Sequence, residues 1–126
     1  MKFAVLGVAL GALLAACGVG GEAVSEEQAV IVHFDYGSTD LKPLFALEAQ
    51  LEEVLEKTGA GEFDGNEVAT DGSDAYLYLY GPDADALLEA IRPTLLAADF
   101  MKRATATKVY GEPGSDVRRE EVQLVP

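Results

Sequence analysis

The feature that most constrains this fold is a strict alternation of leucine and tyrosine, Ala75-Tyr76-Leu77-Tyr78-Leu79-Tyr80. Successive side chains of a β-strand point to opposite faces, so the alternation predicts a strand with one leucine face and one tyrosine face. Such a strand belongs in an antiparallel sheet that packs on an apolar core through one face. The rest of the chain must therefore supply a layer that covers the leucines.

Two segments have the helical spacing that this layer requires. In residues 41–58 the apolar stripe consists of Leu44, Leu47, Leu51 and Leu55. In the segment that follows the capping residue Asp83, it consists of Leu87, Leu88, Ile91 and Leu95. Leucine or isoleucine at every third or fourth position predicts two amphipathic helices that face a common core.

Further strands are expected around these helices. Residues 29–36 and 104–110 are rich in β-branched and aromatic residues, and residues 62–68 form a weaker strand candidate. The order β-α-β-β-α-β predicts an α+β, ferredoxin-like domain with a four-stranded antiparallel sheet, strand order 4-1-3-2, and both helices on one face. Residues 117–124 offer a fifth, C-terminal edge strand. The alternative is a different α+β sandwich in which this segment is central.

The N-terminus carries a separate pattern. A short basic start is followed by an apolar run over residues 3–16, which is too short to span a membrane but suits a secretory signal. The run ends in a motif that resembles the lipobox of bacterial lipoprotein precursors, Leu14-Ala15-Ala16-Cys17. The resemblance implies cleavage before Cys17 and a lipid anchor on its thiol. The alternative is a buried N-terminal helix in a cytosolic protein.

These patterns divide the chain into three parts. Residues 1–16 are expected to be a signal peptide, residues 17–28 a lipidated cysteine with a flexible tether, and residues 29–126 an acidic α+β domain. We expect an exported, membrane-anchored protein of the cell envelope, held in the outer membrane where the cell has one. Because Cys17 is the only cysteine, no intramolecular disulfide can form.

The charge of the chain restricts its partners. The formal net charge is −13 at pH 7, from 22 acidic residues against 9 lysines and arginines. Such a charge repels nucleic-acid phosphates and anionic lipid head groups, so we expect no nucleic-acid partner and a membrane contact through the lipid alone. It favours a basic protein partner, and a homodimer stays open.

Three motifs in the body of the chain support the expected fold. They are Phe34-Asp35-Tyr36-Gly37, GEFDGNE at residues 61–67 and LYGPDAD at residues 79–85. Through them the chain resembles an uncharacterised group of small bacterial ferredoxin-like domains over most of residues 29–111. The resemblance implies the fold and carries no activity.

Two surfaces are candidates for binding. If the leucines of residues 75–80 meet the helices, a patch forms on the open face of the sheet from His33, Asp35, Tyr76, Tyr78 and Tyr80. Alternatively, the patch is covered by a dimer partner or by the C-terminal segment, or it is exposed to solvent. The loops at the membrane-distal end form a second candidate, the distal tip, from Ser38, Asp40, Asp71, Asp74, Lys102 and Arg103.

Metal and catalytic motifs are not recognisable in the sequence. The acidic residues of the segment between residues 64 and 74 do not match an EF-hand, because the sixth position counted from Asp64 is Ala69 and the twelfth is Ala75. The chain has one histidine and lacks the nucleophile, zinc and phosphate-loop motifs of common enzymes. We therefore expect no metal, no cofactor and no catalytic residues.

The sequence favours a non-enzymatic lipoprotein whose domain binds another protein or a second copy of itself. Two alternatives stay open. One is an acidic immunity-type protein that inhibits a basic toxin, because negative surface speeds association with a basic partner. The other is a small-ligand binder or enzyme that uses the open face of the sheet around His33 and Tyr78.

The lipobox generates a direct prediction. Expressed in a bacterium, the parent chain is expected in the membrane fraction, beginning at residue 17 and carrying acyl mass, whereas a Cys17→Ala variant carries none. Cell fractionation and intact-mass measurement of both proteins check this. A soluble parent protein that still begins at Met1 would overturn the lipoprotein interpretation.

Overall fold

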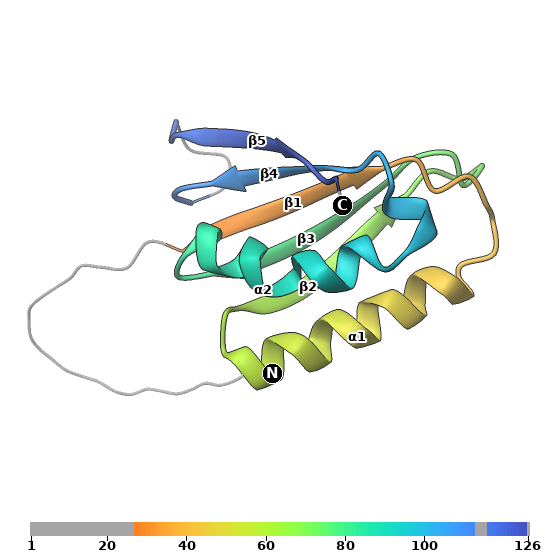
Figure 1. Cartoon of the computed structure of the whole chain (residues 1–126). Coiled ribbons are helices and arrows are strands. Elements are labelled where there is room, and N and C mark those ends of the chain that lie inside the picture. The colour runs from red at the N-terminus through yellow and green to blue at the C-terminus, as the bar shows by residue number, and fades with distance from the viewer. Residues whose placement is uncertain (1–26, 113–115, 126) are drawn as a thin grey trace, which may run out of the picture.

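The computed structural model describes residues 27–112 and 116–125 (Figure 1). The fold is α+β, with two α-helices and a five-stranded antiparallel sheet in the order β2-β3-β1-β4-β5. The strands are β1 (Gln28–Phe34), β2 (Glu62–Val68), β3 (Ala75–Gly81), β4 (Thr105–Val109) and β5 (Arg119–Gln123). The helices are α1 (Lys42–Thr58), α2 (Ala84–Leu96) and the short 3-10 helix η2 (Asp99–Met101). Figure 1 shows α1 and α2 side by side on one face of the sheet.

The sheet differs from the four-stranded sheet predicted from the sequence by one strand. β5 pairs antiparallel with β4 and lies at the edge, which makes five strands and extends the predicted order. The alternative that places residues 117–124 at the centre of a sandwich is wrong. The arrangement is compatible with a ferredoxin-like fold, in which two helices cover one face of an antiparallel sheet.

The core lies between the sheet and the helices, as the alternation in β3 predicted. Ala75, Leu77 and Leu79 are fully buried, whereas the intervening tyrosines are half-buried on the other face. The helix stripes meet these residues, and their buried members are Leu44, Leu47, Leu51 and Leu55 on α1 and Leu87, Leu88, Ile91 and Leu95 on α2. Burial of each such side chain stabilises the fold by about 1.5–3 kcal/mol before chain entropy is counted.

The start of α1 has no side-chain cap at its N-cap position. The N-cap residue is Leu41, which provides no side-chain cap, and a proline lies in the first turn. Asp40, the residue before the N-cap, instead accepts through Oδ1 a hydrogen bond of 3.1 Å from the N–H of Lys42, the first residue of α1. Proline lacks a backbone N–H, so it reduces the number of donors that a cap would have to satisfy.

The loop after β1 is fastened to the hairpin between β2 and β3. Backbone N–H groups of Gly37 and Ser38 both donate to the Gly72 carbonyl, at 2.7 and 3.1 Å. Gly72 has a φ of 76°, and a Cβ atom at this position would lie 2.0 Å from the Ser38 carbonyl oxygen. Only glycine fits there, because both the positive φ and the close backbone approach exclude a side chain.

This contact predicts different costs for two glycines with the same backbone conformation. Gly37 has a φ of 77° and open space around its Cβ position, so Gly37→Ala is expected to cost the left-handed penalty of about 1–2 kcal/mol. Gly72→Ala adds a backbone collision and is expected to cost roughly 3 kcal/mol or more. Urea unfolding of both variants checks this, and equal losses of stability would contradict the close approach.

Candidate functional site

Pairing between strands arranges the face opposite the helices in three rows. Cross-strand partners share a face of a sheet, so each row can be followed from β2 to β5. The first row is Glu67, Tyr76, His33, Thr105 and Gln123, the second is Gly65, Tyr78, Ile31, Thr107 and Glu121, and the third is Glu62, Tyr80, Ala29, Val109 and Arg119. We call this surface the open face, because α1 and α2 cover the other side (Figure 1).

Three rings stand in a stack on the open face. The centroids of His33 and Tyr76 lie 4.3 Å apart with planes inclined by 9°, and those of Tyr76 and Tyr78 lie 6.2 Å apart at 16°. A carboxylate adjoins each end of the stack. His33 Nε2 lies 2.6 Å from Asp74 Oδ1, and the Tyr78 hydroxyl donates a hydrogen bond to Glu67. We call His33, Tyr76 and Tyr78 the ring stack.

A shallow hollow of about 490 Å³ adjoins the ring stack. Its lining residues are Ile31, Glu67, Tyr76, Tyr78, Thr107 and Arg119. Ile31 of β1 and Thr107 of β4 lie between the tyrosines of β3 and Arg119 of β5. The hollow combines two aromatic rings, one carboxylate and one guanidinium around Ile31 and Thr107.

Tyr78 and Tyr80 differ in what holds their hydroxyl protons. The hydrogen bond to Glu67, supported by burial and by the negative charge of Glu67, raises the pKa of Tyr78 to about 12. The pKa of Tyr80 is raised chiefly by burial, with smaller contributions from Asp64 and Glu27. Both hydroxyls are therefore protonated at neutral pH, and Tyr78 is committed as a donor to Glu67.

The third row is less accessible than the other two. Ala29 and Val109 lie on the open face, yet both are fully buried. Tyr80 next to Ala29 is therefore at the margin of the exposed surface. The exposed part of the predicted patch is concentrated around the ring stack and the hollow.

Asp35 is the member of the predicted patch that lies apart from the tyrosines. It follows the end of β1 and is exposed, and its Oδ2 lies 3.5 Å from Arg103 Nη2. The side chains of this pair are 69% and 85% exposed. Because Arg103 belongs to the distal tip, Asp35 lies beside the tip rather than beside the tyrosines. An exposed ion pair of this kind contributes little free energy to holding the two side chains together.

The residues of the distal tip lie at one end of the sheet, where β1 ends, β2 joins β3 and η2 leads into β4 (Figure 1). They form separate local contacts. Ser38 Oγ accepts from the Asp40 N–H at 2.9 Å, and Asp71 Oδ1 accepts from the N–H and hydroxyl of Ser73 at 3.0 and 2.6 Å. Asp74 belongs with the ring stack through His33. Lys102 and Arg103 line a second hollow with Asp35, Asp99 and Phe100.

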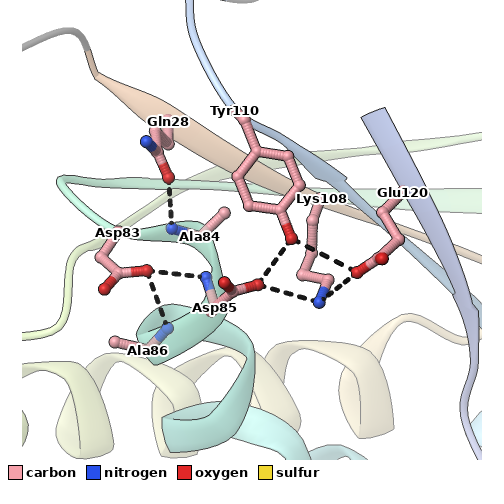
Figure 2. Close-up of polar contacts among 8 residues, drawn as sticks. All are labelled: Gln28, Asp83, Ala84, Asp85, Ala86, Lys108, Tyr110 and Glu120. Atoms are coloured by element: carbon pink, nitrogen blue, oxygen red, sulfur yellow. Dashed lines mark hydrogen bonds and ion pairs between the residues drawn. The ribbon is translucent and has the colours of Figure 1, made fainter. Parts of the chain in front are cut away.

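A polar cluster on the helix side of the sheet was missed by the sequence analysis. Figure 2 shows Lys108 of β4, and Tyr110 just after that strand, directed toward Asp85 of α2 and Glu120 of β5. Lys108 Nζ lies 2.9 Å from Asp85 Oδ1 and 2.6 Å from Glu120 Oε1, and the Tyr110 hydroxyl donates to Asp85 at 2.6 Å. The Arg118 guanidinium lies 4.1 Å from the centroid of the Tyr110 ring. We call these five residues the Lys108 cluster.

The N-terminus of α2 explains how Asp85 reaches this position. Asp83 is the N-cap, and its Oδ1 accepts from the N–H groups of Asp85 and Ala86 at 3.0 and 3.2 Å (Figure 2). The Gln28 side chain accepts from the Ala84 N–H at 2.8 Å, which joins the start of β1 to the same turn. Three of the first donors of α2 are thereby satisfied, and Asp85 is directed toward β4.

Mutual stabilisation of charge is evident within the Lys108 cluster. Hydrogen bonds to Glu120 and Asp85 raise the pKa of Lys108 well above its ordinary value. Hydrogen bonds from Tyr110 and Lys108 lower the pKa of Asp85, and Lys108 lowers that of Glu120. A lysine held so firmly in its charged form is a poor nucleophile or base, so the cluster joins α2, β4 and β5 structurally.

Residues 27–112 and 116–125 contain no group of three histidine, cysteine or acidic side chains placed to hold a metal ion. None of the helices in this same part of the chain has the length and apolarity needed to cross a bilayer. The lipobox residues Leu14, Ala15, Ala16 and Cys17 lie outside the described residues.

Comparison of the chain with models of known protein families, with curated proteins and with solved structures found no match.

The contacts of Lys108 predict that its loss lowers the thermal stability of the domain. The Lys108 side chain is 14% exposed between two carboxylates, so Lys108→Met is expected to lower Tm by roughly 4–8 °C. The matched control is Lys57→Met, because Lys57 is 74% exposed and its pair with Glu53 adds little. Thermal unfolding followed by circular dichroism measures both.

The pH dependence of this loss follows from the pKa directions. Folding lowers the pKa values of Asp85 and Glu120 from 3.8 and 4.5 and raises that of Lys108 from 10.5. The stabilisation is therefore complete between about pH 5 and pH 10, and is lost as pH falls through the lowered carboxyl values. The Tm difference between parent and Lys108→Met is expected to shrink below pH 4. A difference that is constant down to pH 2 would contradict the assignment.

Proposed function

We propose that this chain is a non-enzymatic lipoprotein of the cell envelope whose acidic domain binds a basic protein through the open face of its sheet. The observation that carries the proposal is the ring stack, which stands half-exposed between Asp74 and Glu67 on the face away from the helices. Tyrosine supplies contact area at little cost in side-chain entropy and is enriched at the centres of protein interfaces.

The proposed location rests on the sequence. The motif Leu14-Ala15-Ala16-Cys17 follows an apolar run of the length of a secretory signal, and it is the basis for a lipid anchor on Cys17. We also propose a ferredoxin-like fold for the domain. The consecutive strands β4, β1, β3 and β2 and the shared helix face support it, with β5 as an addition beside β4.

Charge supports a basic partner over a second copy of the chain. Glu67, Glu121 and Asp74 lie on or beside the open face, and the whole chain carries −13. Two copies brought together through this face would oppose like charges, which costs free energy at an interface. A basic protein surface is attracted by the same charges, and long-range attraction raises its association rate. An immunity-type inhibitor of a basic toxin is a special case of this function.

The arrangement around His33 supports binding over catalysis. The imidazole is stacked on Tyr76 and bonded to Asp74 on a surface where both side chains are almost half exposed. Acid–base catalysis gains most in a site that excludes water. An open, solvated surface with large rings suits association with another macromolecule instead.

Site-directed photo-crosslinking in the native envelope tests the proposal. A photoreactive amino acid in place of Thr107, within the hollow, is expected to capture a protein with a basic surface, whereas one in place of the exposed Gln50 on α1 does not. Tyr78→Ala is expected to reduce the adduct at position 107 at least about tenfold. Phe45→Ala, which removes a 52% exposed ring from α1, is the matched control.

Three results would count against the proposed function. The first is equal capture from positions 107 and 50, and the second is an adduct that Tyr78→Ala leaves unchanged. Capture that persists as ionic strength rises from 50 to 500 mM would also contradict a partner selected by charge, because salt at these concentrations screens exposed charges beyond roughly 4–14 Å.

A further inference from the structure

Among the described residues, two tyrosines, Tyr110 and Tyr78, donate their hydroxyl protons to carboxylates, and cations accompany only the first of them. In the Lys108 cluster, the Tyr110 hydroxyl donates to Asp85, and Lys108 neutralises the carboxylate (Figure 2). The Arg118 guanidinium covers the Tyr110 ring. On the open face, the Tyr78 hydroxyl donates to Glu67 in the same way. The first pair therefore shows what the side chains of the second are chemically suited to bind.

The cation is missing from the second pair. Within residues 27–112 and 116–125, no lysine or arginine lies over the rings of Tyr76 or Tyr78, and none forms an ion pair with Glu67. Arg119 lines the hollow from β5 but is exposed and outside ion-pair distance of Glu67. Glu67 is an exposed carboxylate, and in the part of the chain that the structure describes its side chain has one hydrogen-bond partner, the neutral Tyr78 hydroxyl.

We infer that the hollow binds an arginine side chain of the basic partner, with its guanidinium against the Tyr78 ring and paired with Glu67. The inference rests on the proposed function and specifies what the open face recognises. A guanidinium stacks on an aromatic ring and bonds a carboxylate through parallel N–H groups at the same time. Its methylene stem packs against apolar surface, which the hollow offers at Ile31 and Thr107.

Arg119 makes the electrostatic potential of the hollow asymmetric. It lines the side opposite Glu67, so a cation that enters is repelled by Arg119 and attracted toward Glu67 and the ring stack. The geometry assigns two opposite roles to two charged residues of one hollow. Removing Glu67 is expected to weaken binding of a cation, and removing the charge of Arg119 is expected to strengthen it.

The test uses the purified full chain in detergent and three capped tripeptides, acetyl-Gly-X-Gly-amide, in which X is arginine, lysine or citrulline. Citrulline has nearly the shape of arginine without its charge. Tyrosine ring resonances of Tyr76 and Tyr78 are followed by NMR at low ionic strength. The shifts are expected to saturate with the arginine peptide at a dissociation constant on the order of 1 mM, because a single exposed cation site provides only a few kcal/mol of binding free energy. Lysine is expected to bind more weakly, and citrulline to give no saturable shift.

Three variants, each of which removes one charge, complete the test. Glu67→Gln is expected to weaken arginine binding by about fivefold or more, and Arg119→Gln to strengthen it by about twofold. Glu56→Gln on the exposed side of α1 makes the same charge change elsewhere and is expected to have no effect. Saturable citrulline binding, equal binding of lysine and arginine, or indifference to Glu67→Gln would overturn the inference.

The two proposals fail in different ways. If the arginine peptide does not bind while the adduct at position 107 still depends on Tyr78, the open face binds a partner through other chemistry, and this inference is wrong. If the adduct is absent or independent of Tyr78, the proposed function is wrong.

Discussion

The position of β3 is the constraint on which the rest of the structure depends. This strand pairs with β1 on one side and β2 on the other, and its alternating residues supply both the centre of the core and the rings of the open face. A shift of one residue in its register would send Leu77 and Leu79 into water and the tyrosine hydroxyls into the core. Burial of Leu77 and Leu79 in the core therefore also places the tyrosine side chains on the open face. The packing of the core thus determines which side chains this face presents to a partner.

Most of the helices and strands could be predicted from the sequence, because the spacing of apolar residues within each segment indicates its secondary structure. The leucine stripes located α1 and α2, and the alternation in residues 75–80 located β3 and assigned its faces. The added strand β5 was harder, because Arg119–Gln123 is short and mostly exposed, and its place follows from pairing with β4 rather than from its own pattern. The start of α1 could not be read from the sequence, because Ser38, Thr39 and Asp40 all offer capping oxygens, whereas the N-cap position is taken by Leu41.

The candidate site shows the same division between local and long-range information. Placing His33 beside Tyr76 required only the order of strands and the alternation within them. The pairing of Tyr78 with Glu67 depends on the register of β2 against β3, which is interrupted between Phe63 and Gly65. The Lys108 cluster joins three elements that are up to 35 positions apart along the chain, from Asp85 to Glu120. One signal for it was present, because Lys108 and Tyr110 are two residues apart in the strand predicted over residues 104–110, a spacing that places both side chains on one face.

The central position of β1 has a mechanical consequence. The chain enters the described domain at Gln28, and β1 then runs the full length of the sheet with β3 on one side and β4 on the other (Figure 1). A pull on the chain before Gln28 is therefore directed along β1 and loads the hydrogen bonds of both ladders in shear at once. Strands at an edge can be peeled off one bond at a time, but β1 cannot. A domain anchored through this end would resist extension most strongly in the direction in which its own anchor pulls.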